Sequence, residues 1–164
     1  PIGRHLDGCR IGFDAGGSDR KVSAVIDGKS VYSEEVVWFP KTNSDPDYHY
    51  DGILSAMKSA AEHMPRVDAI GVSSAGVYVD NRIMVASLFL KVNDEDFDKK
   101  VKDIYKDYLR MMKLRYAKRL ILASKKPIVD IAAESGYGSQ SHFNREFKQF
   151  FGATPLQMRR EYEK

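Results

Sequence analysis

Short apolar runs alternate with turn residues over the first part of the chain, which is the pattern of β-strands. Residues 10–14 form a short apolar run, residues 22–26 are rich in β-branched side chains, and a third strand is predicted over 30–38. Asp27-Gly28, between the second and third runs, is a strong signal for a two-residue hairpin turn. The pattern therefore predicts three strands in an antiparallel meander.

A crossover helix is expected after the meander. Residues 40–48 are rich in Pro, Asp and Asn and predict a loop, whereas residues 50–63 carry apolar side chains at helical spacing. Residues 68–73 have the pattern of a further strand, with 77–79 as a possible extension of the sheet and 82–86 as another short strand. This order predicts an α/β lobe with a mixed sheet.

From Asp94 onward the pattern is helical only. No Gly or Pro interrupts residues 94–124, so one long helix and two helices meeting near Lys106 are equally compatible with the spacing. Shorter helices are predicted over 127–134, 140–150 and 156–162. Two short helices separated by a glycine-containing turn, the second of them polar on its outer face, follow the plan of a helix-turn-helix.

Charge is distributed unevenly between these two parts. The 164 residues carry a formal net charge of +3, but residues 1–105 carry −4 and residues 106–164 carry +7. A basic surface concentrates polyanions such as nucleic acid. The alternative is that these lysines and arginines only keep the helices soluble.

Composition excludes several classes of protein. Apolar residues make up 43% of the chain, as in globular proteins, and no apolar run approaches the roughly 18–20 residues of a membrane-spanning helix. The single Cys9 excludes an internal disulfide, and the four histidines lack metal-ligand spacing, so neither a metal nor a cofactor is expected. The polar start predicts no signal peptide and a cytoplasmic location. Because the chain starts at Pro1, an initiator residue or an upstream segment is expected to be missing.

The region around residues 108–162 resembles the second half of the AraC-type DNA-binding domain. The resemblance is carried by YLRMMKLRYAKRLIL at 108–122, PIVDIAAESGY at 127–137 and SHFNREFKQFFGATP at 141–155. It implies that 108–122 connects two helix-turn-helix units and that 127–151 is the second unit. It also implies a sequence-specific DNA-binding module of a transcription regulator, with double-stranded DNA as its partner.

The resemblance further implies which side chains contact DNA. Base contacts are expected from the first turns of the second helix, at Gln140, Ser141, His142, Asn144 and Arg145. These residue types suit the task, because Arg pairs with guanine and Gln or Asn with adenine. Phosphate contacts are expected from Arg119, Lys126 and Lys148. The alternative is that this face is only a solvated helix surface, with His142 as a capping or surface residue.

The chain departs from the AraC pattern before Tyr108, where a first helix-turn-helix unit should lie. Residues 10–105 instead resemble the first lobe of the actin and sugar-kinase superfamily, most closely the ROK (repressor, ORF, kinase) family. The resemblance is carried by RIGFDAGGSDRKVSAV from Arg10 and VDAIGVSSAG from Val67. It implies a phosphate loop that binds a nucleotide through Asp14, Gly16, Gly17 and Ser18, although a plain hairpin turn is the alternative.

The remainder of the kinase fold has no counterpart in residues 106–164. Phosphoryl transfer needs nucleotide, metal and acceptor held together, so no enzymatic activity is expected, and binding of a nucleotide or anion should be weak at most. The expected organisation is a truncated ROK-like α/β lobe over 1–105 followed by an all-α helix-turn-helix segment over 106–164.

Three hypotheses follow for the function of the whole chain. The first is a DNA-binding module, which needs a homodimer for useful affinity because one unit reaches one groove. The second is a ROK or sugar-kinase fragment that binds a nucleotide or sugar. The third is a natural or engineered fusion without function. Halves that pack together and halves that are merely tethered are both compatible with the sequence.

Overall fold

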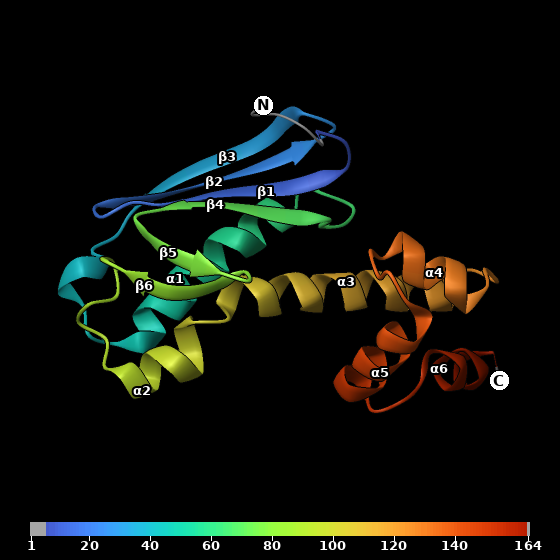
Figure 1. The fold of residues 1–164 in the computed structure, drawn as a ribbon. Helices are drawn as coiled ribbons and strands as arrows, with labels where there is room; N and C mark the ends of the chain where they lie inside the picture. Colours follow the sequence, from blue (N-terminus) through green and yellow to red (C-terminus); the bar gives the residue numbers. More distant parts are fainter. Residues whose placement is uncertain (1–5, 164) are drawn as a thin grey trace. The chain divides into compact units, whose positions relative to one another are not determined.

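The computed structural model describes residues 6–163, which divide into two compact units (Figure 1). The first, α/β unit ends at Leu109, and the second, helical unit begins at Arg110. Helix α3 (Ile104–Ala123) crosses this division, so its first residues belong to the α/β unit and the rest to the helical unit. The division lies four residues beyond the boundary expected from the change in charge.

A four-stranded sheet with the strand order β3-β2-β1-β4 forms the α/β unit. The strands are β1 (Cys9–Ala15), β2 (Asp19–Ile26), β3 (Lys29–Val37) and β4 (Ala69–Ser74). β2 is antiparallel to β1 and β3, whereas β4 is parallel to β1. Asp27 and Gly28 both have positive φ, 48° and 79°, as a type I′ hairpin turn requires. The predicted meander and mixed sheet are confirmed.

Helix α1 (Pro46–Ala61) covers one face of this sheet (Figure 1). It begins four residues before the predicted start, because Asp45 caps it by accepting a hydrogen bond from the Asp47 amide at 2.9 Å. Proline at the first helical position favours the same start. Apolar side chains from both layers form the core of the unit, among them Ile11, Phe13, Val22, Ile53, Met57 and Ala60.

Strands β5 (Gly76–Val79) and β6 (Arg82–Ala86) form a separate two-stranded sheet. The expected extension of the main sheet by residues 77–79 is therefore wrong. The reason is local: Asp80 and Asn81 have φ of 50° and 63°, so the chain reverses at once and β5 pairs with β6. Arg82 then binds both carboxylate oxygens of Asp103, at 2.7 and 2.9 Å, and so ties β6 to the segment before α3.

The chain after residue 93 is entirely helical, as predicted. Its elements are α2 (Asp94–Asp96), a π-helical turn (Phe97–Val101), α3, α4 (Ile128–Glu134), α5 (Gln140–Phe151) and α6 (Pro155–Tyr162). Residues 102–103 interrupt the helix before α3, so neither an unbroken helix over 94–124 nor a junction at Lys106 is found. None of the helices in the described part of the chain is long and apolar enough to cross a membrane.

The start of α3 packs into the core of the α/β unit. Ile104, Tyr105 and Tyr108 are all buried, and the ring centroids of Tyr105 and Phe13 are 5.9 Å apart. The helix therefore begins as part of the α/β core and continues as part of the helical unit.

Candidate nucleic-acid interface

An apolar core inside the helical unit holds α5, the second helix of the helix-turn-helix. Phe143 and Phe147 of α5 are fully buried, with ring centroids 5.4 Å apart. The same cluster contains Leu114, Ala117 and Ile121 of α3 together with Ile131 and Ala132 of α4. Because Phe143 and Phe147 are four residues apart, they lie on one side of α5 and leave the opposite side to solvent.

Most of the α5 side chains predicted to contact DNA are exposed: Gln140, Ser141, His142, Arg145 and Lys148. Ser141, Arg145 and Lys148 form one row along the helix, because they are spaced by four and three residues. Within residues 6–163, these three side chains have no hydrogen-bond or ion-pair partner. This row, called the outward row below, is thus free to bind a ligand.

Asn144 differs from the other predicted base contacts. It is half-buried, and its Oδ1 atom is buried with no hydrogen-bond partner in the described part of the chain. Asn144 lies three residues before the buried Phe147, at the edge of the packed side of α5. Gln149, four residues after Arg145, is exposed on the outward side although it was not predicted. Helical spacing from Arg145 is the signal that would have identified it.

The turn between α4 and α5 is fixed by a cap and a half-buried ring. The Ser139 hydroxyl accepts a hydrogen bond from the His142 amide at 3.2 Å, which caps α5. The ring of Tyr137 contacts Phe143 and His142 with centroid distances of 5.2 and 5.6 Å. Burial raises the pKa of Tyr137 to about 12. The first turn of α5 is therefore held from two sides.

The two phosphate contacts predicted outside α5 differ in their surroundings. Arg119 is exposed, and its guanidinium lies 5.5 Å from the centre of the Tyr116 ring. Lys126 is also exposed, but its Nζ atom forms an ion pair with Glu134 Oε2 at 2.7 Å, and the Glu134 carboxylate raises the pKa of Lys126. The Tyr116 hydroxyl donates to the other Glu134 oxygen at 2.8 Å. A phosphate at Lys126 would have to share the ammonium group with Glu134 or replace it.

Three polar contacts that the sequence did not reveal hold the helical unit together. Arg110 Nη1 of α3 lies 3.4 Å from Glu146 Oε2 of α5, and the Glu146 side chain is only 15% exposed. Arg159 of α6 donates hydrogen bonds to the carbonyls of Ile121, at 3.4 Å, and Lys126, at 2.8 Å. No local pattern signals any of these contacts, because the partners are 36 positions apart in the ion pair and 38 and 33 positions apart in the two hydrogen bonds.

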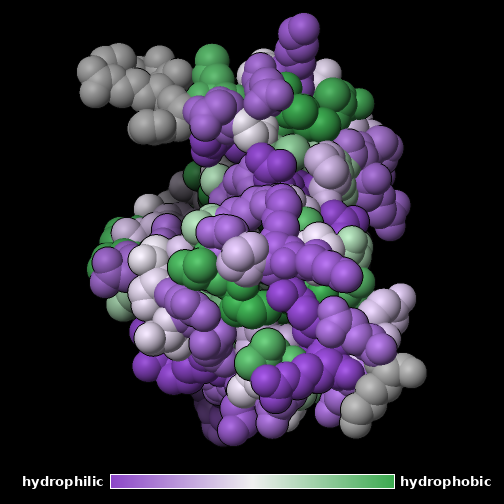
Figure 2. All heavy atoms as spheres, turned by 90° about the vertical axis from the view of Figure 1, so that its right-hand side faces the viewer, coloured by the Kyte–Doolittle hydropathy of each residue, from purple (hydrophilic) through white to green (hydrophobic). Residues whose placement is uncertain are grey.

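The surface around these helices suits a polyanion. Residues 106–164 carry a net charge of +7. Figure 2 shows the side of the molecule that lies at the right in Figure 1, where hydrophilic residues predominate and hydrophobic residues form small, separate patches. Such a surface favours a highly charged ligand over an apolar one.

The predicted phosphate loop lies at the β1–β2 connection of the α/β unit. Its members are Asp14, Gly16, Gly17 and Ser18. The Gly16 carbonyl accepts a hydrogen bond from Trp38 Nε1 at 2.8 Å, which fixes the turn. A Cβ atom on Gly17 would lie 2.8 Å from Lys41 Nζ, so an amino group lies directly beside the loop.

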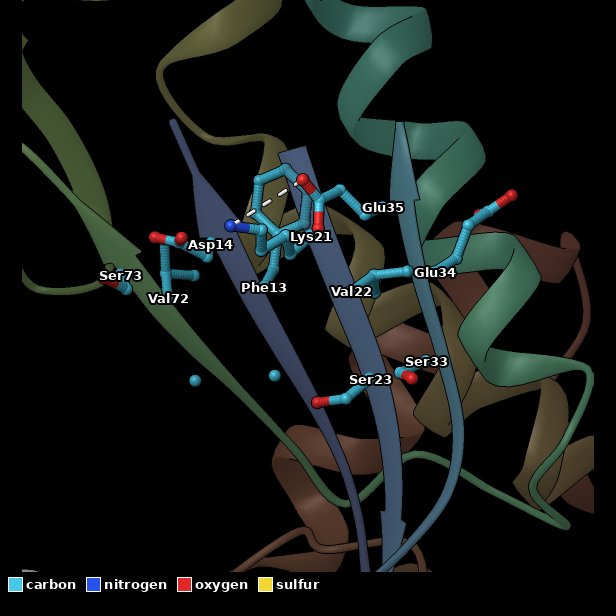
Figure 3. A pocket seen from close by; sticks show the side chains of 12 residues that line it. Phe13, Asp14, Lys21, Val22, Ser23, Ser33, Glu34, Glu35, Val72 and Ser73 are labelled. Atoms are coloured by element: carbon cyan, nitrogen blue, oxygen red, sulfur yellow. Dashed lines mark ion pairs between the residues drawn. The ribbon is translucent and has the colours of Figure 1, made fainter. Parts of the chain in front are cut away.

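A depression of about 640 Å³ lies on the sheet face opposite α1 (Figure 3). Its floor is a row of small residues at paired register positions: Ser33, Ser23, Gly12 and Gly71. Asp14 lines it, as does Lys21, which forms an ion pair with Glu35 at 3.8 Å. Gly16, Gly17 and Ser18, the other members of the predicted loop, are not among the residues that line it. Among residues 6–163, no group of three or more His, Cys, Asp or Glu side chains could hold a metal ion.

The α/β unit has a distant likeness among solved structures. A ROK family glucokinase from Streptomyces griseus, solved in complex with glucose and AMPPNP, matches with a TM-score of 0.45 and 20% sequence identity. The match covers 68% of this chain and 36% of the glucokinase chain.

The helical part of the chain matches a known protein family. Residues 95–161 match the family model described as a helix-turn-helix domain, beginning upstream of Tyr108. The virulence regulon transcriptional activator VirF of Yersinia enterocolitica is 47% identical over 47 residues, which are 29% of this chain and 17% of VirF. The regulatory protein SoxS of Escherichia coli is 40% identical over 53 residues, 32% of this chain and 50% of SoxS.

A third relative has a longer match. The porin thermoregulatory protein EnvY of Escherichia coli is 35% identical over 82 residues, which are 48% of this chain and 32% of EnvY. The chain thus matches between about a sixth and a half of the length of these three relatives. All three are regulatory proteins by description. Residues 95–161 are therefore a helix-turn-helix domain of the AraC type.

Proposed function

We propose that the chain binds double-stranded DNA through α5 and acts as the DNA-binding module of a transcription regulator. The observation that carries this proposal is the outward row of α5, which projects to solvent while Phe143 and Phe147 anchor the other side of the helix. An α-helix fits the major groove of B-DNA, and its N-terminal residues reach base edges. The +7 charge of residues 106–164 would supply the attraction to the phosphates.

The side chains of this surface suggest distinct roles. Arg145 has the two parallel donors that recognise guanine, and Gln140 can pair with adenine. Ser141 and His142 complete the first turn that faces base edges, whereas the half-buried Asn144 contributes less than the sequence suggests. Phosphate contacts fall to Lys148 and Arg119, and to Lys126 once a phosphate replaces Glu134.

A single recognition helix reaches a single major groove, so we propose that two chains act together on DNA. Helix-turn-helix dimers bind half-sites spaced by about one helical turn, roughly 10 base pairs. A duplex with two such half-sites should therefore bind more tightly than a duplex with one half-site. Analytical ultracentrifugation of the chain with each duplex measures the number of bound copies.

Fluorescence anisotropy with the full chain tests the DNA proposal. The probes are a duplex enriched from a random library by this chain and a scrambled duplex, each at low and high salt. The affinity should fall steeply with salt, and Arg145→Ala should weaken binding to the enriched duplex about ten-fold. Arg115→Ala removes the same charge from an exposed position on α3 and should cost less. Absence of binding at low salt, or equal losses in both variants, would reject the proposal.

A weak anion site at the β1–β2 turn is a second candidate function, supported by the Lys41 amino group beside Gly17. Calorimetric titration with magnesium ATP tests it, and saturable binding should disappear in Asp14→Ala and in Lys41→Ala. We expect no phosphoryl transfer, because the chain has no counterpart of the second half of a kinase cleft. Failure of both the DNA and the ATP titration would favour the third hypothesis, a fusion without function.

The proposed DNA binding also bears on enzymatic activity and on location in the cell. We propose that the chain is not an enzyme and resides in the cytoplasm, where a transcription regulator meets DNA. The regulatory descriptions of VirF, SoxS and EnvY support this assignment. Fractionation of cells that express the chain, followed by detection in the nucleoid-containing fraction, tests the location.

A further inference from the structure

We propose that Arg110 and Glu146 are positioning residues that set how α5 presents its outward row to DNA. This inference rests on the proposed DNA binding. Arg110 lies on α3 and Glu146 in the middle of α5, and their ion pair joins the two helices through Nη1 and Oε2 at 3.4 Å. Neither residue is among the side chains expected to touch DNA.

The place of Glu146 on α5 couples it to the outward row. Successive residues of an α-helix are about 100° apart, so Glu146 and the adjacent Arg145 keep a fixed angle around the helix axis. A rotation of α5 that breaks the contact between Glu146 and Arg110 must turn Arg145 by the same angle. The ion pair therefore resists a rotation of α5 that would displace Arg145.

The apolar core and the ion pair constrain this rotation in different ways. Phe143 and Phe147 hold α5 through hydrophobic packing, which has little directional preference. A charge-assisted hydrogen bond is directional, and the Glu146 side chain is only 15% exposed, so separation from Arg110 would leave a largely buried carboxylate without its partner. The aromatic rings thus bury one side of α5, and the ion pair adds a directional contact that narrows the range of its rotation.

The surroundings of the pair connect it to the first turn of α5. Besides burial, the Glu146 carboxylate raises and the Arg110 guanidinium lowers the pKa of Tyr137, so both charges act on this ring. The Tyr137 ring in turn contacts His142 in the first turn of α5. The Arg110 Nε atom is buried without a hydrogen-bond partner in the described part of the chain, although the Arg110 side chain as a whole is 42% exposed, so Glu146 is the partner that lies mostly out of water.

A double-mutant cycle with the full chain tests the inference. The variants are Arg110→Gln, Glu146→Gln and the double variant, with Arg115→Gln and Glu161→Gln as exposed controls of matching charge change. The readout is discrimination, the ratio of affinities for the enriched and the scrambled duplex. Each single variant should lower it about ten-fold, which corresponds to one lost base contact, and the double variant no further. Unchanged discrimination, or losses that multiply in the double variant, would overturn the inference.

Hydrogen exchange without DNA gives a second, independent readout. In Arg110→Gln and Glu146→Gln the amides of α5 should exchange faster than in the wild-type chain, while those of α4 and α6 should not change. Uniform acceleration over all three helices would show a general loss of stability and overturn the positioning role. A wild-type chain that binds neither duplex would reject the proposed function itself, whereas unchanged discrimination in a chain that binds rejects only the role of the pair.

Discussion

Lys126 Nζ lies 2.7 Å from Glu134 Oε2, in an ion pair within the helical unit. Lys126 is one of the residues proposed to contact a DNA phosphate. The Tyr116 hydroxyl holds the other oxygen of the same carboxylate at 2.8 Å. In the proposed complex, Glu134 would compete with this phosphate for Lys126, and the lysine would add to affinity only what exceeds the loss of the ion pair.

Removal of this competition should strengthen DNA binding. We expect Glu134→Gln to tighten binding to any duplex a few-fold at low salt and to steepen the salt dependence by about one unit, because Lys126 then neutralises one more phosphate. Anisotropy titrations at several salt concentrations measure both quantities. Glu161→Gln makes the same change in net charge at an exposed site on α6. An equal gain in that variant would show that net charge alone is responsible.

Truncation of Phe147, a buried aromatic side chain of α5, should destabilise the helical unit. Phe147 is fully buried in the cluster that joins α3, α4 and α5, so Phe147→Ala should lower the free energy of unfolding by about 3–5 kcal/mol. Phe150→Ala, at a position that is 41% exposed, should cost far less. Urea unfolding followed by circular dichroism makes the comparison. Similar losses in the two variants would contradict the assigned core.

Loss of the α5 cap should have a smaller effect. The Ser139 hydroxyl accepts the His142 amide proton, so Ser139→Ala should destabilise the helical unit by about 1 kcal/mol. Ser141→Ala changes a serine of the same helix that has no hydrogen-bond partner among residues 6–163, and it should leave stability nearly unchanged. The same urea experiment measures both. A cap that costs nothing to remove would argue against the helix start described above.

The α/β unit should lose stability in mild acid because of His49. Its ring is completely buried, its Nε2 atom lies 3.0 Å from the Asn43 carbonyl oxygen, and its Nδ1 atom has no partner among the described residues. Burial lowers the pKa of His49, so the unfolded chain takes up a proton before the folded one does. Stability should be constant above about pH 7 and should fall as the pH drops below about 6.5, until the folded-state pKa is passed.

Urea midpoints measured between about pH 5 and pH 8 check this dependence. His49→Gln should remove most of the slope, whereas His63→Gln, at an exposed position, should keep it. A slope that persists in His49→Gln would assign the effect to other groups.

Local patterns predicted the elements whose causes are local. Asp27-Gly28 identified its hairpin because only the backbone of those two residues decides the turn. Helical spacing predicted the helix over 140–150 with a polar outer face, and α5 confirms it. The detached β5–β6 sheet was missed, because Asp80-Asn81 is a weaker turn signal than Asp27-Gly28 although it adopts similar positive φ angles.

The exposure of the candidate interface residues was predictable from the sequence, but their contacts were not. Exposure of Ser141, Arg145 and Lys148 follows from helical spacing, whereas the half-burial of Asn144 depends on how closely α5 packs on its neighbours. The partners of Glu134 and Glu146 are brought near by tertiary structure alone. Pairings of this kind leave no periodic trace in a single sequence.

The buried start of α3 limits how the chain can be dissected. A fragment of the helix-turn-helix that keeps residues 104–109 would expose the rings of Tyr105 and Tyr108 to water. A fragment that begins at Arg110 would place this residue, which forms the ion pair with α5, at a frayed helix end. No loop separates the two units at this point, because helix α3 is continuous across the division between them. A soluble, DNA-competent fragment would therefore need polar replacements at both tyrosines, and the intact chain is the better starting material.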